Sequence, residues 1–267
     1  MRVHVLVLGV LLLTGAAASA QNTPAPKQAP ASKDDAKLDG YLTKWEQKMR
    51  EVKTLNAKLA RIDKDKVLST TTKYVGSAQY LRSGEGQSAL NLAALELKQE
   101  NKTETAEKMI CTGTYLYVFA PPQKEIRAYE IPKGKTDSFL DLLFGMKAED
   151  VKKKYTLTLA KEDDWYVYVD VVPKDAKDKV DFARARLVLY RDSNNWKDKA
   201  YLPRQLWFEH ANGNEVTWDV SAIETGVKLD RRLFDAPKTP NGWKLVPVTQ
   251  EKAQQQPRVV RPSSPKQ

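Results

Sequence analysis

A segment near the middle of the chain restricts the fold more than any other. From Cys111 to Gly145 the sequence predicts a strand, a tight turn, a second strand and a short apolar helix. The first of these strands carries two alternating sets of apolar side chains: Tyr115, Tyr117 and Phe119 on one side, and Leu116, Val118 and Ala120 on the other. A sheet with one face in water needs only one apolar face. We therefore expect both sides of this strand to be covered, by protein or by a bound apolar ligand.

The two ends of the chain look like segments outside the folded domain. Residues 1–20 contain Arg2, an apolar run and the sequence Ala18-Ser19-Ala20, which together predict a signal peptide cleaved after Ala20. Residues 21–37 are rich in proline, alanine and lysine and predict a disordered linker, and residues 249–267 predict a disordered, basic, proline-rich tail. We expect a folded domain over 38–248, in a protein that is periplasmic or otherwise exported.

Composition and net charge limit the classes of binding partner that we expect. The formal net charge is +10, which favours acidic partners such as an anionic membrane or a cell-wall surface. An exported protein rarely meets nucleic acid, so we do not expect nucleic-acid binding. Cys111 is the single cysteine, so no intramolecular disulfide can form and stability must come from burial. A monomer is the simplest expectation.

The rest of the pattern predicts one helix followed by many strands. Apolar residues recur at helical spacing near the start of the domain: Leu38, Tyr41, Leu42, Trp45, Met49 and Val52. Strands are expected at 54–62, 72–82, 88–98, 108–120, 125–131, 155–160, 165–172, 181–191, 206–210 and 215–222, and short helices at 137–144 and 148–154. The fold class is therefore α+β, mostly β: a strongly curved antiparallel sheet, or incomplete β-barrel, with the amphipathic helix and the short helices on its concave side.

Catalytic chemistry finds little support in the sequence. After signal cleavage His210 is the single histidine, and no serine lies in a nucleophile elbow. Cys111 lies among apolar and small residues, which is typical of an inert buried thiol. One histidine and one cysteine do not make a zinc site. We expect no enzyme activity, no cofactor and no metal. A hydrolase built on two carboxylates stays open, because sequence does not tell which acids meet in space.

Two motifs and the order of elements resemble LolA/LolB-like periplasmic lipoprotein carriers, in a secreted bacterial branch. The first motif is the hairpin strand Leu116-Tyr117-Val118-Phe119-Ala120-Pro121, followed by an apolar short helix. The second is Arg232-Leu233-Phe234-Asp235-Ala236-Pro237 with Asn241-Gly242-Trp243. The resemblance spans about 38–248, which is nearly all of the expected domain.

The resemblance implies an apolar cavity that holds lipid or lipoprotein acyl chains. The candidates to line it are Tyr115, Tyr117, Phe119, Leu140, Leu143 and Phe144. Arg82 matches the family arginine that helps to hold a lid closed, although Ser83 stands where the family has proline. The alternative is a structural or interaction domain of the cell envelope, with a collapsed core and no ligand.

Overall fold

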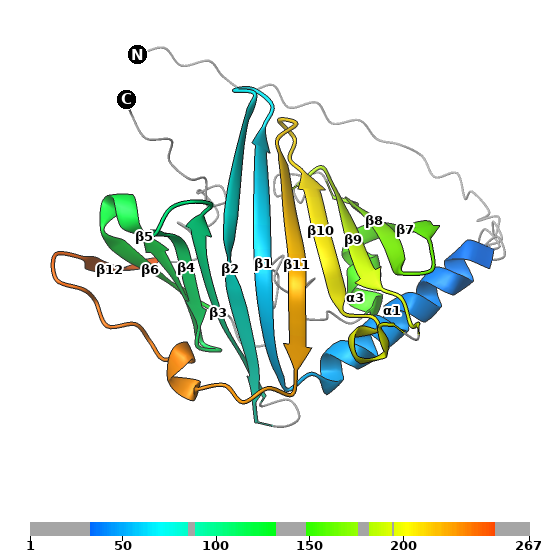
Figure 1. Cartoon of the computed structure of the whole chain (residues 1–267), viewed down its shortest axis with the longest axis horizontal. Helices are drawn as coiled ribbons and strands as arrows, with labels where there is room; N and C mark the ends of the chain where they lie inside the picture. The colour runs from blue at the N-terminus through cyan, green and yellow to red at the C-terminus, as the bar shows by residue number, and fades with distance from the viewer. Residues whose placement is uncertain (1–32, 85–88, 132–147, 176–181, 194, 249–267) are drawn as a thin grey trace, which may run out of the picture. The chain divides into compact units, whose positions relative to one another are not determined.

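The computed structural model describes residues 33–84, 89–131, 148–175, 182–193 and 195–248. All the described residues belong to one compact unit. They form a mostly β, α+β fold, with two α-helices and a single 12-stranded sheet (Figure 1). Neither of these helices is long and apolar enough to cross a membrane.

The elements follow the predicted order closely. The helices are α1 (Lys33–Glu51) and α3 (Ala148–Lys154). The strands are β1 (Thr54–Asp65), β2 (Thr70–Ser83), β3 (Leu90–Gln99), β4 (Thr105–Cys111), β5 (Tyr115–Ala120), β6 (Glu125–Glu130), β7 (Tyr155–Glu162), β8 (Tyr166–Pro173), β9 (Arg184–Tyr190), β10 (Pro203–Glu209), β11 (Glu215–Thr225) and β12 (Lys244–Val248).

Two strand predictions need correction. The single strand expected over 108–120 is two strands, β4 and β5, because Gly113 takes a left-handed φ of 87° and the Thr112 amide donates to the Tyr115 carbonyl at 2.9 Å. Strand β12 was missed altogether, since five residues that include Pro247 give a weak strand pattern. The expected helix at 137–144 lies outside the described residues.

The strand order is β12-β6-β5-β4-β3-β2-β1-β11-β10-β9-β8-β7. Every neighbouring pair is antiparallel except β12 with β6, which is parallel. The antiparallel sheet is as predicted, but the sheet is neither closed nor strongly curled. Its two end strands, β12 and β7, have no described partner on their outer sides, and Pro247 in β12 lacks the amide that a further ladder would use.

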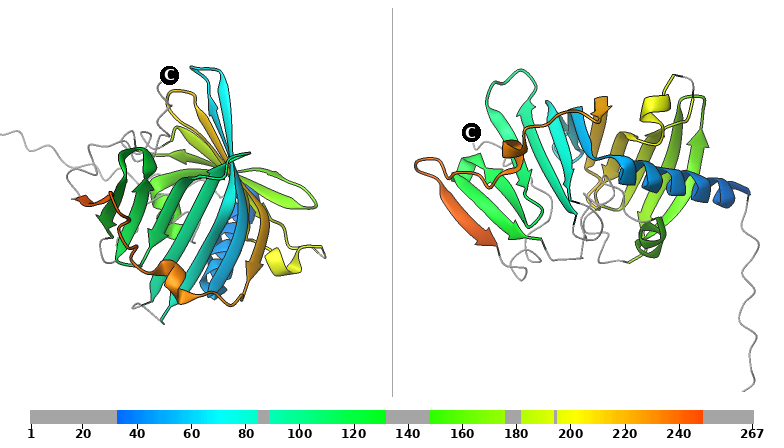
Figure 2. Two further views of the ribbon diagram at one scale, coloured as in Figure 1. Left: turned by 60° about the vertical axis from the view of Figure 1, so that its left-hand side comes forward. Right: turned by 90° about the horizontal axis from the view of Figure 1, so that it is seen from below.

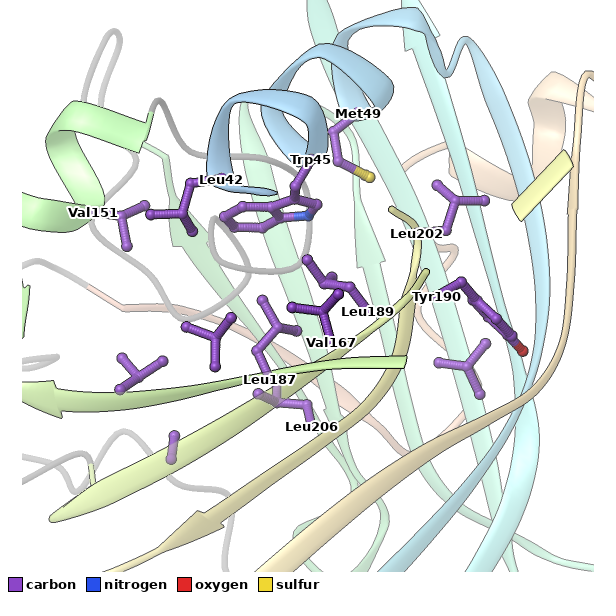
Figure 3. Close-up of a cluster of buried hydrophobic side chains, with 14 of the residues drawn as sticks. Leu42, Trp45, Met49, Val151, Val167, Leu187, Leu189, Tyr190, Leu202 and Leu206 are labelled. Carbon is purple, nitrogen blue, oxygen red and sulfur yellow. The ribbon is translucent and has the colours of Figure 1, made fainter. Parts of the chain in front are cut away.

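We call the face that α1 covers the inner face. On β1 it carries Leu55, Ala57 and Leu59, which alternate with polar residues. Strands β1 and β7–β11 form the helix-covered half of the sheet, and α1 lies across it (Figures 1 and 2). The buried core there includes Leu42, Trp45, Met49, Val151, Val167, Leu187, Leu189, Tyr190, Leu202 and Leu206 (Figure 3).

Helix α1 has the sequence features of a stable amphipathic helix. Its buried residues are Leu38, Leu42, Trp45 and Met49, spaced four, three and four apart. Asp34 and Asp35 lie in the first turn and basic residues in the last, which complements the helix dipole. These acidic residues explain why the helix begins at Lys33, earlier than the apolar pattern indicates.

Strands β2–β6 and β12 form the other, helix-free half. Its outer face is packed by the segment between β11 and β12, which includes the short 3-10 helix η5 (Arg231–Phe234). Phe234 is 3% exposed, and the ring of Trp243 lies edge-on to Phe119 with the ring centroids 6.2 Å apart. The chain thus crosses the outer face of this half before it adds β12 at the edge. Neither described helix lies over the inner face of this half (Figure 2).

Candidate functional site

The inner face of the helix-free half carries an apolar surface that we call the inner lane. Strand register places its side chains in rows across β2, β3, β4 and β5. The lane consists of Ala78, Ala93, Leu95, Leu97, Met109, Cys111, Leu116, Val118 and Ala120. Most of these side chains are half-buried, whereas Leu97 and Val118 are buried. The lane continues the surface on which α1 packs in the other half, so the same sheet face is apolar across both halves.

One end of the lane meets a buried charged cluster. The Arg61 guanidinium contacts the Glu107 carboxylate at 2.5 Å, and its Nε lies 3.0 Å from the Asp63 carboxylate. The aromatic rings of Tyr74 and Trp218 lie 4.4 Å and 5.1 Å from the guanidinium carbon. Cation–π contacts and two carboxylates therefore compensate the burial of Arg61, which is 6% exposed.

The cluster joins strands that are not neighbours. Arg61 lies on β1 and Glu107 on β4, with β2 and β3 between them. Neighbouring strands are about 4.8 Å apart, so the two side chains meet over a gap of roughly 14 Å between backbones. Both side chains project from the inner face and reach toward each other across β2 and β3. Gly76 on β2 allows the close strand packing, since a Cβ there would lie 1.9 Å from the Glu96 carbonyl oxygen.

Burial raises the pKa of Asp63, and the charge of Arg61 only partly opposes this effect. Among the described residues, Asp164 and Asp192 line one surface hollow, and Asp63 and Glu107 meet in the charged cluster. Asp63 and Glu107 meet around an arginine, in a buried position, and line neither of the two surface hollows described below. This arrangement gives no room for the water or substrate that a hydrolytic carboxylate pair needs.

The predicted lining residues of β5 face the other side of the sheet. Tyr115, Tyr117 and Phe119 lie on the outer face, opposite the lane. Tyr115 is 40% exposed, and with Tyr117 it borders a hollow of about 290 Å³ against Phe234 of η5. Their roles as ligand-lining residues stay predictions. Leu140, Leu143 and Phe144 lie outside the described residues.

Arg82 holds the end of α1. Its Nη1 donates to the carbonyl of Arg50 at 2.8 Å, and its backbone amide donates to the carbonyl of Lys53 at 2.7 Å. The last carbonyls of a helix have no partner within the helix, and a basic side chain there also complements the dipole. Arg82 thus ties β2 to the helix that covers the core. Its role as a gate stays a prediction.

The remaining chemical candidates fit structural roles. Burial raises the pKa of the Cys111 thiol, whose Sγ contacts the carbonyl of Asn91 at 3.4 Å. A thiol in such surroundings is a poor nucleophile. His210 ends the β10 side of the hairpin, where its amide donates to the Asn214 carbonyl. Within the described ranges, no group of three metal-ligating side chains comes together.

Sequence reasoning missed the Arg61 cluster. A signal was present, because Arg61 and Asp63 share the strand alternation of Leu55, Ala57 and Leu59. Charged residues at inward positions of a strand are unusual unless they are paired. Glu107 alternates with Met109 and Cys111 in the same way, but the sequence does not show that it pairs with Arg61, because the two residues are 46 positions apart.

No protein-family model matches the sequence, and neither does any curated protein. Solved structures do resemble the fold. An uncharacterized conserved protein from Thermus thermophilus is 10% identical with a TM-score of 0.47, over 79% of this chain and 99% of that one. LprF from Mycobacterium bovis is 10% identical with a TM-score of 0.37, over 77% and 97%. A LolA superfamily protein from Nitrosomonas europaea is 11% identical with a TM-score of 0.35, over 74% and 97%. These likenesses concern the fold alone, and the geometry of this chain must carry any functional conclusion.

Proposed function

We propose that this protein is an exported, non-enzymatic binding protein that holds acyl chains of a lipoprotein or another amphiphile against the inner lane, as a periplasmic carrier. The observation that supports this most directly is the lane itself: a half-buried apolar surface with no described helix over it. The two sequence motifs that resemble LolA/LolB-like carriers point the same way.

The lane has the chemistry that an acyl chain requires. Ala78, Ala93 and Ala120 are small, so a thin chain can lie between the larger side chains. Met109 adds a flexible and polarizable contact. Each buried methylene of a ligand contributes about 0.8 kcal/mol, so a chain of ordinary length gains several kcal/mol from contact with such a surface. Binding would need no covalent step and no cofactor.

Adjacent residues of β5 provide a sharp test of the lane. Leu116 belongs to the lane and Tyr117 to the outer face, and both are half-buried. We expect Leu116→Asn to weaken the binding of a fluorescent C16 fatty acid about tenfold, because a polar group would replace apolar contact. Tyr117→Asn should retain wild-type affinity. The reverse result would move the ligand to the outer face, where Tyr115, Tyr117 and Phe119 lie.

Native mass spectrometry of the protein purified from its own host tests the proposal without a chosen probe. A carrier should retain bound lipid that organic extraction removes. Protein that is free of lipid and also fails to bind the fatty acid would exclude the carrier function.

The alternative, a cell-envelope domain with no ligand, has one observation in its favour. Leu97 is fully buried and Val118 is 7% exposed, as expected for a lane that protein already fills. In that case Leu116→Asn would lower stability and leave no binding to measure.

We also propose an anionic membrane surface as a partner. The turn between β1 and β2 holds Val67 and Leu68, which are 75% and 61% exposed. The turn is ordered, because the Asp65 carboxylate accepts from both of their amides at 2.9 Å. Lys64 and Lys66 lie at its base, where their ammonium groups contact the Glu215 carboxylate at 3.5 Å and 2.9 Å. Two apolar side chains at a tip with lysines behind them fit insertion between anionic headgroups.

Vesicle sedimentation tests this contact separately from ligand binding. We expect the protein to sediment with vesicles of phosphatidylglycerol and phosphatidylcholine, and the double change Val67→Ser with Leu68→Ser to release it. Leu233→Ser is a matched control, since Leu233 is 45% exposed elsewhere. Equal sedimentation of all three proteins would contradict the role of the tip.

A further inference from the structure

A second surface of the helix-covered half has the features of a binding site, independent of the inner lane. It is a hollow of about 520 Å³ between the β7–β8 turn and the segment after β9. We call it the Trp165 hollow. Its lining residues are Asp164, Trp165, Arg191, Asp192, Ser193 and Asn195. Strands β7 and β8 lie at the end of the strand order opposite β12 and the helix-free half (Figure 1).

Hydrogen bonds fix the two walls of the hollow to each other. The Asp163 carboxylate accepts from the amides of Trp165 at 3.0 Å and Tyr166 at 2.8 Å, which orders the turn. The Arg191 amide donates to the Trp165 carbonyl at 2.9 Å, and its guanidinium donates to the Asp163 carbonyl at 2.7 Å. The geometry of the hollow is therefore built before any ligand arrives, which lowers the entropic cost of binding.

The hollow presents an aromatic ring to solvent. Trp165 is 46% exposed, although tryptophan is usually highly buried. Its ring contacts Trp196 edge-on, with centroids 6.2 Å apart and planes at 67°. Trp196 thus supports one side of Trp165, and the rest of the ring stays open to a ligand. Large aromatic rings in this position often act as binding anchors.

Polar groups surround the ring. Asp164 and Asp192 supply acceptors, and Asn195 supplies both a donor and acceptors. The hydroxyl of Ser193 is buried and has no hydrogen-bond partner among the described residues. A buried hydroxyl without a partner costs free energy.

Charged groups of both signs surround the ring. The lining carries the carboxylates of Asp164 and Asp192 and the guanidinium of Arg191, and the Lys199 ammonium lies 5.4 Å from the centre of the Trp196 ring. A ligand with both hydrogen-bond donors and acceptors suits such a mixed lining better than an ion of one sign. A pyranose ring has one face of C–H groups, which packs on an aromatic ring, and a rim of hydroxyls, which suits carboxylate, amide and hydroxyl partners. We propose that the Trp165 hollow binds a neutral saccharide.

Calorimetric titration and tryptophan fluorescence of the protein test this site. The probes are the trimer of N-acetylglucosamine and, separately, maltotriose. We expect saturable binding of at least one of them, with Trp165→Ala weakening it at least about tenfold. Trp165→Phe should retain part of the affinity, and Asp192→Asn should weaken binding about fivefold. Leu233→Ala, at an equally exposed apolar position, should leave binding unchanged.

Three results would overturn the proposal. The first is no saturable signal with either probe up to about 20 mM, a range that would detect even millimolar affinity. The second is equal affinity in the protein and in a Trp165→Ala variant with an unchanged circular dichroism spectrum. The third is saturation by tetramethylammonium with no response to saccharide, which would assign the ring to cation–π recognition instead.

Discussion

The two halves of the sheet differ in which faces they bury: the helix-covered half packs its inner face beneath α1, whereas the helix-free half buries residues on both faces, including Leu97 of its inner face at 0% exposed. In the helix-covered half, the inner face is buried beneath α1 and includes Val167 and Leu189, both 0% exposed. In the helix-free half, the outer face is well packed: Ile126 is 0% exposed, and Leu92 and Phe234 are 3% exposed. Both halves alternate apolar and polar residues in similar ways. Alternation therefore decides which faces can be buried, and the cover decides which face becomes a core.

The cover of the first half is firmly held. Near the start of α1, the Tyr41 hydroxyl donates to Glu162 at 2.7 Å and the Lys37 ammonium contacts the same carboxylate at 2.6 Å. In the middle, Glu46 accepts from the amide of Ala148 at 2.9 Å. At the end, Arg82 donates to the carbonyl of Arg50. Helix α1 is thus a fixed part of the core.

The largest effect should come from the centre of the helix-covered half. Trp45 is 1% exposed and packs between α1 and the strands (Figure 3). Trp45→Ala should lower the free energy of unfolding by about 3–5 kcal/mol, because it removes a large buried side chain and leaves a cavity. Urea unfolding followed by circular dichroism measures this. Trp45→Phe should lower the free energy of unfolding clearly less than Trp45→Ala does, since the indole Nε1 has no hydrogen-bond partner among the described residues.

The charged cluster links the two halves and should give the next effect. Glu107→Gln removes a carboxylate from the buried guanidinium of Arg61. We expect urea unfolding to show a free energy of unfolding lower by about 3 kcal/mol. This is the lower end of the loss that follows when a buried ion pair is broken, because Asp63 still faces Arg61. The double change Arg61→Leu with Glu107→Leu should be less destabilising than Glu107→Gln alone. If Glu107→Gln left the free energy of unfolding unchanged, the Arg61–Glu107 pair would contribute nothing to the junction of the two halves.

Two leucines compare the inner faces directly. Leu187 is 2% exposed beneath α1, and Leu95 is half-buried in the inner lane. Leu187→Ala should lower the free energy of unfolding by about 3 kcal/mol, and Leu95→Ala by about 1 kcal/mol. The difference arises because Leu95→Ala leaves no closed cavity. Equal losses would mean that protein covers the lane as completely as α1 covers the other half.

The smallest effect concerns the hydrogen bond between Tyr41 and Glu162 near the start of α1. Burial, together with the hydrogen bond to Glu162, raises the pKa of Tyr41 to about 12. A phenol with a raised pKa binds its proton more tightly in the folded state. Its contribution to stability is present below pH 10 and is lost as the pH rises from 10 toward 12. Ultraviolet titration should show this late step, and Tyr41→Phe should remove it while the other tyrosines titrate as before.

Particular residues show how far the sequence could lead. The helix residues Leu38, Leu42, Trp45 and Met49 were found from spacing alone, because helical periodicity is a local property. The turn between β10 and β11 is equally local, because Gly213, which follows Asn212, has the left-handed φ of 81° that such a turn needs. The Arg61–Glu107 pair was not found, since its partners are 46 residues apart and meet only after four strands are in register.

The sequence by itself determined the elements, the mostly β class and the two apolar faces of β5, because propensity and alternation act over a few residues. It did not determine which face each half buries. Tertiary structure decided that, since α1 packs mainly on β1 and β7–β11 while the segment around Phe234 packs on the outer face of β3 and β4. Both faces of β5 look alike in sequence. The position of distant segments makes Tyr115, Tyr117 and Phe119 outer residues and leaves Leu116, Val118 and Ala120 in the lane.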